Sequence, residues 1–302
     1  MPIVLTTAVW LGAWPGQNAP AWSAAPSRTT DNLTAAHPSP KAVFADCADV
    51  CPEMVVLPPG RFDRGAPYVD ADPPPLYSPP ETVIIERAFA IGRYPVTVGE
   101  YAAFVRDTGR TDVGNCRTGR GTVGPEGFDP AGSWADPAFP QTDRHPVVCV
   151  DVDDARAYAA WLSKRTGHVY RLPSDREWEY AAKGGVTKKD YDKGEQAEDI
   201  CKFANVADRD YQASHPGGGV EPCHDGYSHT SPVGSFPGNE FGLFDMIGNV
   251  YQWTSTSRSG GVQLAGGGAW SSSAYEARAS HHQAWQGDWR AGWIGFRVVR
   301  EL

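Results

Sequence analysis

Glycine and proline recur along the whole chain, and this feature limits the possible fold more than any other. The 302 residues include 33 Gly and 26 Pro, so roughly one residue in five tends to interrupt a helix or a central strand. The chain also carries 11 Trp, 12 Tyr and 11 Phe, which supply large apolar surfaces for a core. This composition excludes a coiled coil, a collagen and a wholly disordered chain. It predicts an α+β domain with little regular secondary structure.

The charge balance excludes several classes of partner. Lys and Arg number 27 against 36 Asp and Glu, which gives a net charge of −9. Because no basic block is present, the sequence does not favour a nucleic-acid groove or a polybasic membrane anchor. No Gly-rich phosphate loop, zincin helix or Gly-x-Ser-x-Gly elbow is present either, so a hydrolase has little support.

The N-terminal segment has the features of an export signal. Residues 3–14 are apolar and uncharged, too short for a membrane helix of about 20 residues but suited to a signal-peptide core. The first positive charge is Arg28, so residues 1–25 are either a signal peptide or an apolar N-terminal segment. Residues 26–51 are rich in Ala, Pro and Ser and are expected to form a linker, followed by one domain over residues 52–302. No integral membrane span is expected.

The cysteines point to an oxidising compartment. They are even in number and lack zinc-finger spacing. Cys47 and Cys51, at the end of the linker, can form a local disulfide, with two free thiols or half of a metal site as the alternatives. A bridge between Cys201 and Cys223 would close a Gly-rich loop. The spacing leaves the overall connectivity open, and a periplasmic or secreted location is expected. The six are Cys47, Cys51, Cys116, Cys149, Cys201 and Cys223.

Capping signals predict three short helices. Thr97 and Glu100 form a capping box that opens the first, and Ser174 and Glu177 form another that opens the third. The second helix follows Asp151, and no helix is expected beyond residue 185. Glycines end all three helices, at Gly109, near Gly167 and at Gly184-Gly185; strands are expected at 54–57, 82–85 and 296–299.

Several segments together resemble the formylglycine-generating enzyme family, also called the sulfatase-modifying factor family. The most specific is Arg171-Leu-Pro-Ser-Asp-Arg-Glu-Trp-Glu-Tyr-Ala-Ala182. The resemblance covers about residues 52–302 and implies the family's variant of the C-type-lectin fold. The segments that carry it are 54–62, 89–97, 145–148, 171–182, 239–253, 267–270 and 294–297.

The resemblance implies structural calcium, for which oxygen-rich turns provide the hard ligands. The first set of family ligands maps to Asn205, the Val206 backbone, Asp225 and the Tyr227 backbone. A second set maps to Asp245, Gly248, Val250 and Gln252, where Gln252 replaces the usual Glu and removes one charge. The alternative is that Asp225 and Asp245 only cap turns.

The resemblance also raises the possibility of catalysis, which depends on a pair of copper-binding cysteines. The family enzyme oxidises a substrate cysteine to formylglycine with two of its own cysteines, which bind Cu(I), a metal that prefers soft thiolates. The corresponding segment here, residues 268–278, contains no cysteine, and none follows Cys223. Copper is therefore not expected, and formylglycine formation ranks third among the possible functions.

A binding function is the first expectation. Residues 271–293 combine aromatic and small polar side chains, as binding loops do, in the segment that presents the ligand surface in this fold. We expect this groove to bind a protein, peptide or small molecule of the cell envelope; simple core packing of its tryptophans is the alternative. The candidate ligand-binding residues are Ser271, Tyr275, Trp285, Trp289 and Trp293.

The second expectation is an oxidase of different chemistry, similar to the family's exported pyoverdine-maturation member. Its candidate catalytic residues are Glu276, Arg278, His281 and His282. Adjacent histidines on a strand point in different directions, so a metal shared by His281 and His282 is not expected. Packed histidines and an ordinary ion pair between Glu276 and Arg278 are the alternatives.

Overall fold

The computed structural model describes residues 40–65, 81–111, 114–118, 127–185, 197–216 and 219–302. All of them belong to the unit His37–Leu302. The predicted signal segment, residues 1–25, lies outside the described residues. Within the predicted linker, the short strand β1 is present and adds to a sheet.

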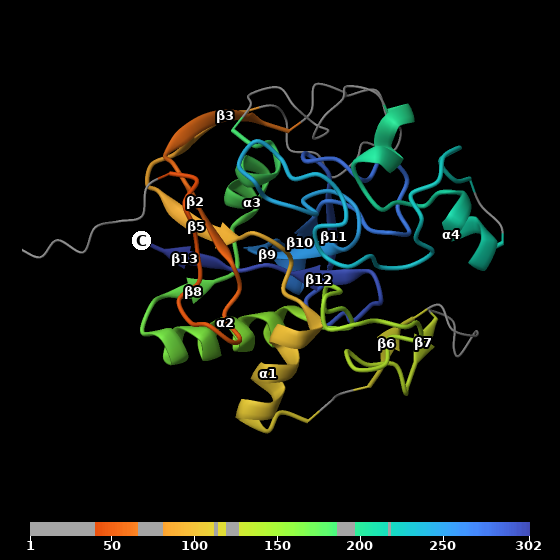
Figure 1. Cartoon of the computed structure of the whole chain (residues 1–302), viewed down its shortest axis with the longest axis horizontal. Helices are drawn as coiled ribbons and strands as arrows, with labels where there is room; N and C mark the ends of the chain where they lie inside the picture. The colour runs from red at the N-terminus through yellow and green to blue at the C-terminus, as the bar shows by residue number, and fades with distance from the viewer. Residues whose placement is uncertain (1–39, 66–80, 112–113, 119–126, 186–196, 217–218) are drawn as a thin grey trace, which may run out of the picture. The chain divides into compact units, whose positions relative to one another are not determined.

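A five-stranded antiparallel sheet lies beside a four-stranded sheet at the centre of the molecule (Figure 1). The first has the order β1-β2-β5-β13-β8, and in the second, of order β11-β10-β9-β12, only β12 runs parallel to its neighbour. The strands of the first sheet are β1 Val43–Phe44, β2 Met54–Leu57, β5 Phe89–Gly92, β8 Tyr170–Arg171 and β13 Val299–Glu301. Those of the second are β9 Tyr251–Ser257, β10 Val262–Gly266, β11 His282–Gln286 and β12 Ile294–Phe296. Two hairpins join β3 Gly60–Arg64 to β4 Glu81–Ile85 and β6 Cys116–Arg117 to β7 Phe128–Asp129.

Strand β2 shows why the sheet is buried on both faces. Met54 and Val56 pack in the hydrophobic cluster that contains α1 and α2, whereas Val55 and Leu57 pack in the cluster that contains α3. Because successive side chains of a strand point to opposite faces, a run of four apolar residues is buried only between two layers. In Figure 1 α1 and α2 lie on one side of the sheets and α3 on the other.

The three predicted helices are confirmed, and each begins with a complete capping box. Thr97 caps α1, Val98–Thr108; Asp151 caps α2, Val152–Thr166; and Ser174 caps α3, Asp175–Ala182. Gly109 and Gly167 end the first two in the left-handed region, with φ of 64° and 76°. The remaining helical turns are η1 Ala197–Lys202, α4 Arg209–Ser214 and η2 Ser259–Gly261.

Two predictions about the C-terminal half are wrong. Helix α4 lies beyond residue 185, but it buries no side chain and is held by its Asp208 cap, so it leaves no apolar stripe in the sequence. The strand expected at 296–299 is divided between β12 and β13, which belong to different sheets. Between them the fully buried Arg297 donates to the Gly92 carbonyl in β5 and to the Gln252 side chain in β9, which ties the crossing chain to both sheets; it also donates to the backbone oxygens of Phe244 and Asp245.

All six cysteines form disulfides. The predicted pairs Cys47–Cys51 and Cys201–Cys223 are present. The third, Cys116–Cys149, fastens the β6–β7 hairpin to the chain just before α2. Among the described residues, no helix is long and apolar enough to cross a membrane.

Candidate functional site

The predicted ligand-binding segment follows Trp270, makes a series of largely buried turns and continues into β11. Tyr275 is its most exposed large side chain, with 42% of its surface accessible. The Arg278 guanidinium lies 4.1 Å from the centre of the Tyr275 ring, and its Nε donates to the Tyr275 carbonyl at 2.6 Å. Because Arg278 itself is buried, an outward aromatic ring is held over an inward cation.

Glu276 acts within its own turn. Its carboxylate accepts hydrogen bonds from the Ser273 amide at 3.0 Å and the Ser273 hydroxyl at 3.2 Å. Half-buried Ser271 precedes this turn. The carboxylate therefore stabilises the turn that presents Tyr275.

The three tryptophans of the segment are half-buried and pack against the main core. Trp285 meets the Tyr251 ring edge-on, with the ring centroids 5.0 Å apart, and stacks on Trp289. The Arg117 guanidinium lies 3.4 Å from the centre of the Trp289 ring, so Trp289 contacts the β6–β7 hairpin. Trp293 accepts from the Tyr251 amide through its carbonyl, at 2.9 Å. These contacts are those of packing residues, and Tyr275 is the aromatic side chain that faces solvent.

The adjacent histidines face different neighbours, as the strand geometry predicts. The His281 ring lies near Tyr251 and Tyr275, with centroid distances of 6.4 and 6.3 Å. The His282 ring packs edge-on against Trp178, at 5.5 Å. Burial lowers the pKa of each histidine to about 4, so both are neutral at pH 7.

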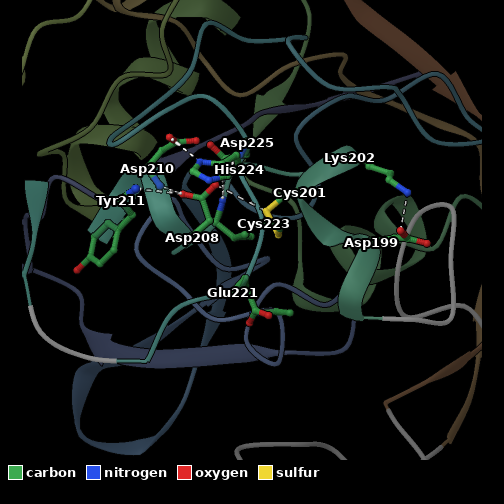
Figure 2. Close-up of a disulfide and its surroundings, with 12 residues drawn as sticks. Asp199, Cys201, Lys202, Asp208, Asp210, Tyr211, Glu221, Cys223, His224 and Asp225 are labelled. Atoms are coloured by element: carbon green, nitrogen blue, oxygen red, sulfur yellow. Dashed lines mark hydrogen bonds and ion pairs between the residues drawn. A yellow bond between two sulfur atoms is a disulfide. The ribbon is translucent and has the colours of Figure 1, made fainter. Parts of the chain in front are cut away.

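The Asp225 carboxylate links three members of the first predicted calcium set, and Figure 2 shows it near Asp208 and Asp210. Its two oxygens accept from the Val206 amide and the Tyr227 amide, both at 2.8 Å. Asn205 is fully buried; its Nδ2 donates to the His229 carbonyl, and its Oδ1 has no hydrogen-bond partner. An oxygen of this kind, buried without a donor, fits a cation site.

Asp208 is a second carboxylate at this site that the sequence analysis missed. It is fully buried, accepts from the Asp225 amide and lies 3.7 Å from the Cys201 sulfur. Ligand atoms of Cys201, Asp208 and Asp225 lie within 4.8 Å of one another, although the Cys201 sulfur is committed to its disulfide. Burial raises the pKa of Asp225 to about 7. The charges of Asp208 and Asp210 add to this rise, and the hydrogen bonds from Val206 and Tyr227 oppose it. The Asp208-x-Asp210 spacing was the available sequence signal.

The second predicted set of calcium ligands is occupied by hydrogen bonds within the protein. The Gln252 Oε1 atom already accepts from Trp178 Nε1 at 2.9 Å and from Arg297 Nε at 2.6 Å, and Gln252 Nε2 donates to the Asp245 carbonyl. The Asp245 carboxylate accepts from the Gly234 amide at 2.7 Å. Gly248 and Val250 are joined by a backbone hydrogen bond. A buried guanidinium thus supplies positive charge beside these groups, which does not favour a calcium ion there.

The cysteines supply no thiolate for copper, because all six are consumed by the three disulfides. The site therefore consists of an outward tyrosine over a buried arginine, a nearby carboxylate cluster and disulfide-fastened loops.

These features belong to a known class of protein, the mixed α+β domains of the formylglycine-generating enzyme fold. Residues 39–302 match the family described as sulfatase-modifying factor enzyme 1-like domain, and the chain belongs to this family. It is 34% identical to the formylglycine-generating enzyme of Mycobacterium tuberculosis, over 68% of this chain and 74% of that protein. It is 32% identical to the inactive C-alpha-formylglycine-generating enzyme 2 of Bos taurus, over 67% and 70% of the two chains.

A solved structure resembles the chain over more of its length. PvdO from Pseudomonas aeruginosa is 37% identical, with a TM-score of 0.72, and the match covers 88% of this chain and all of that one. The relatives thus include enzymes, a protein named inactive, and PvdO. Family membership alone does not decide between catalysis and binding.

Proposed function

We propose that this protein is an exported member of the family that binds a peptide or small molecule of the cell envelope through the surface around Tyr275. The observation that carries the proposal is the exposed Tyr275 ring held over the buried Arg278 guanidinium. Rigid aromatic side chains supply contact area at low entropic cost and dominate many binding sites. Glu276 fixes the turn that presents the ring.

The cysteine pairing supports binding in preference to formylglycine formation. Cu(I) in this family requires a pair of thiolates, and the disulfides consume every cysteine of this chain. The disulfides also support the export proposal, because such bonds persist in oxidising compartments.

Calcium is proposed at the first ligand set, with Asp208 added to Asn205, Val206, Asp225 and Tyr227. Two neighbouring carboxylates and an unpartnered buried amide oxygen form a hard, oxygen-rich donor set. A divalent ion would offset the burial and the carboxylate repulsion that together raise the Asp225 pKa. Its role would be to fasten the loops that carry these ligands.

A second candidate is an oxidase of different chemistry, similar to the pyoverdine-maturation member of the family. The likeness to PvdO over 88% of the chain favours it. Its candidate residues are Arg278, His281 and His282, since Glu276 serves the turn. Burial keeps both histidines neutral and lowers their pKa to about 4, so they would position a substrate better than they would act as bases at pH 7.

One experiment separates the two. The untagged protein is screened against an array of defined short peptides and oligosaccharides, and the best probe is measured by calorimetry with wild type and the Tyr275→Ala variant. Binding is expected to fall at least about tenfold in the variant, a loss of about 1.4 kcal/mol. Ile84→Ala, which removes another exposed apolar side chain, is the matched control and should bind like wild type. Equal binding by the Tyr275 variant would refute the proposal, and oxygen uptake with the probe would favour the oxidase.

A further inference from the structure

A cluster of aromatic rings around Trp270 contains two histidines that play no part in the functions proposed above. His215 follows α4, and His229 lies in the loop after the Asp225 turn. Their ring centroids are 5.0 Å apart, and the ring planes meet at 67°. Both are half-buried, and both pack against Trp270, at 5.4 and 4.9 Å. Two half-buried imidazoles, from the end of α4 and from the loop after the Asp225 turn, are therefore brought together.

The hydrogen bond of His215 fixes which of its nitrogens is able to bind a ligand. Its Nδ1 lies 3.2 Å from the Tyr211 carbonyl oxygen. A carbonyl only accepts, so Nδ1 carries the proton and Nε2 carries the lone pair. The Tyr211 ring stacks on the imidazole at 4.4 Å and 7°, which holds its plane. Histidines that bind metals have this same arrangement, with the second nitrogen donating to a carbonyl.

His229 is held equally firmly. Its ring stacks on Phe139 at 4.6 Å and 21°, and it lies against Trp270 on another side. Its backbone carbonyl accepts from Asn205 Nδ2 at 2.8 Å. Both the ring and the backbone are thus fixed before any ligand arrives, which lowers the cost of ordering them on binding.

We propose that His215 and His229 form a site for a borderline divalent transition metal such as Zn²⁺. Two imidazoles bound to one zinc ion, with zinc–nitrogen bonds of about 2.0–2.1 Å, have their ring centroids about 5–6 Å apart. The observed 5.0 Å lies in this range. Water or a ligand oxygen completes the coordination, beside the Trp270 that precedes the Tyr275 segment.

This site is chemically distinct from the proposed calcium site. Imidazole nitrogen selects zinc, copper or nickel, whereas the carboxylates around Asp225 select calcium. The two sites are joined through Asn205, whose side chain donates to His229. Excess calcium during the measurement therefore separates zinc binding at the histidines from weak binding at the carboxylates.

Zinc titration of the untagged full chain, with calcium in excess, tests the proposal. Wild type should bind one Zn²⁺ per chain by calorimetry, and His215→Gln and His229→Gln should each weaken binding at least about tenfold. His168→Gln and His224→Gln are matched controls with exposed side chains, and they should bind zinc like wild type. Absence of zinc binding by wild type would overturn the proposal, and so would an equal loss in His224→Gln, which would place the ion at the carboxylates.

A second measurement uses only the wild-type protein and so does not depend on the folding of a variant. Long-range proton–nitrogen NMR spectra of the wild-type imidazoles should show that zinc shifts the His215 Nε2 and one His229 nitrogen, while the His168 ring is unchanged. Unchanged spectra of both cluster histidines at saturating zinc would show that their contact is aromatic packing only, and would refute the site.

Discussion

Replacing Asp225 by Asn should lower stability in the presence of calcium and change it little in chelator. In the folded protein the pKa of Asp225 is about 7, against 3.8 for the free side chain, because the carboxyl is buried near Asp208 and Asp210. A raised folded pKa means that this group's stabilisation is complete below about pH 4 and is lost as the pH rises to about 7. The difference corresponds to about 4 kcal/mol, which solvent screening of this partly exposed group reduces to about 2 kcal/mol.

The amide of the Asp225→Asn variant carries no charge, so this pH dependence should disappear. The single oxygen of the new side-chain amide still accepts a hydrogen bond from the backbone N–H of either Val206 or Tyr227. Its NH₂ group then faces the N–H of the other residue, and this unfavourable contact costs about 1 kcal/mol. The removal of a buried charge stabilises the variant, and this cost opposes it. In chelator at pH 8 the variant should therefore unfold within about 1 kcal/mol of wild type.

In the presence of calcium, wild type should be clearly more stable than the Asp225→Asn variant. At a free concentration one hundred times its Kd, calcium stabilises wild type by about 2.7 kcal/mol, and the variant loses most of this gain. Urea unfolding at pH 8, in chelator and in calcium, measures both values; the corresponding loss of Tm is about 5–10 °C. Asp199→Asn, an exposed carboxylate paired with Lys202, is the control and should respond to calcium like wild type. A variant that loses as much stability in chelator as in calcium would refute the calcium site.

Three further predictions concern the scaffold and the ligand surface. Arg297→Met should destabilise the protein by about 3–5 kcal/mol in urea, because several buried oxygens lose their donor. The double variant Cys116→Ser and Cys149→Ser should lose about 3–4 kcal/mol without reductant, and in reductant, where all three disulfides are open, it should be as stable as wild type. Tyr275→Ala should leave the free energy of unfolding within about 0.5 kcal/mol of wild type while it abolishes probe binding, and a collapse of the Tm would mean that Tyr275 is a core residue.

The parts of the fold that were predictable are those fixed by local chemistry. Each predicted helix begins with a side-chain cap within a few residues of an apolar stripe, so the sequence reveals it. Helix α4 has a cap but no buried face, so its sequence shows no periodic apolar residues that would predict a helix. The break between β12 and β13 depends on Arg297, whose partners lie far away in the chain. Such long-range contacts have no local signature.

The candidate site was predictable in part for similar reasons. Asp225 was found through the family resemblance, but Asp208 becomes a neighbour of Asp225 only when the chain between them folds back. Composition drew attention to Trp285, Trp289 and Trp293, yet it does not distinguish a packed ring from an exposed one. Tyr275 stands out once exposure is known. The pairing of His215 with His229 likewise required the fold.

Native mass spectrometry of the protein mixed with its best array probe tests the central proposal most directly, because one spectrum reports both the complex and the probe's mass. We predict a one-to-one complex that is lost in Tyr275→Ala and retained in Ile84→Ala, with the probe released at its original mass. A probe that gains or loses atoms on the protein would contradict a binding function and support the oxidase. A complex of equal strength with Tyr275→Ala would show that another surface binds.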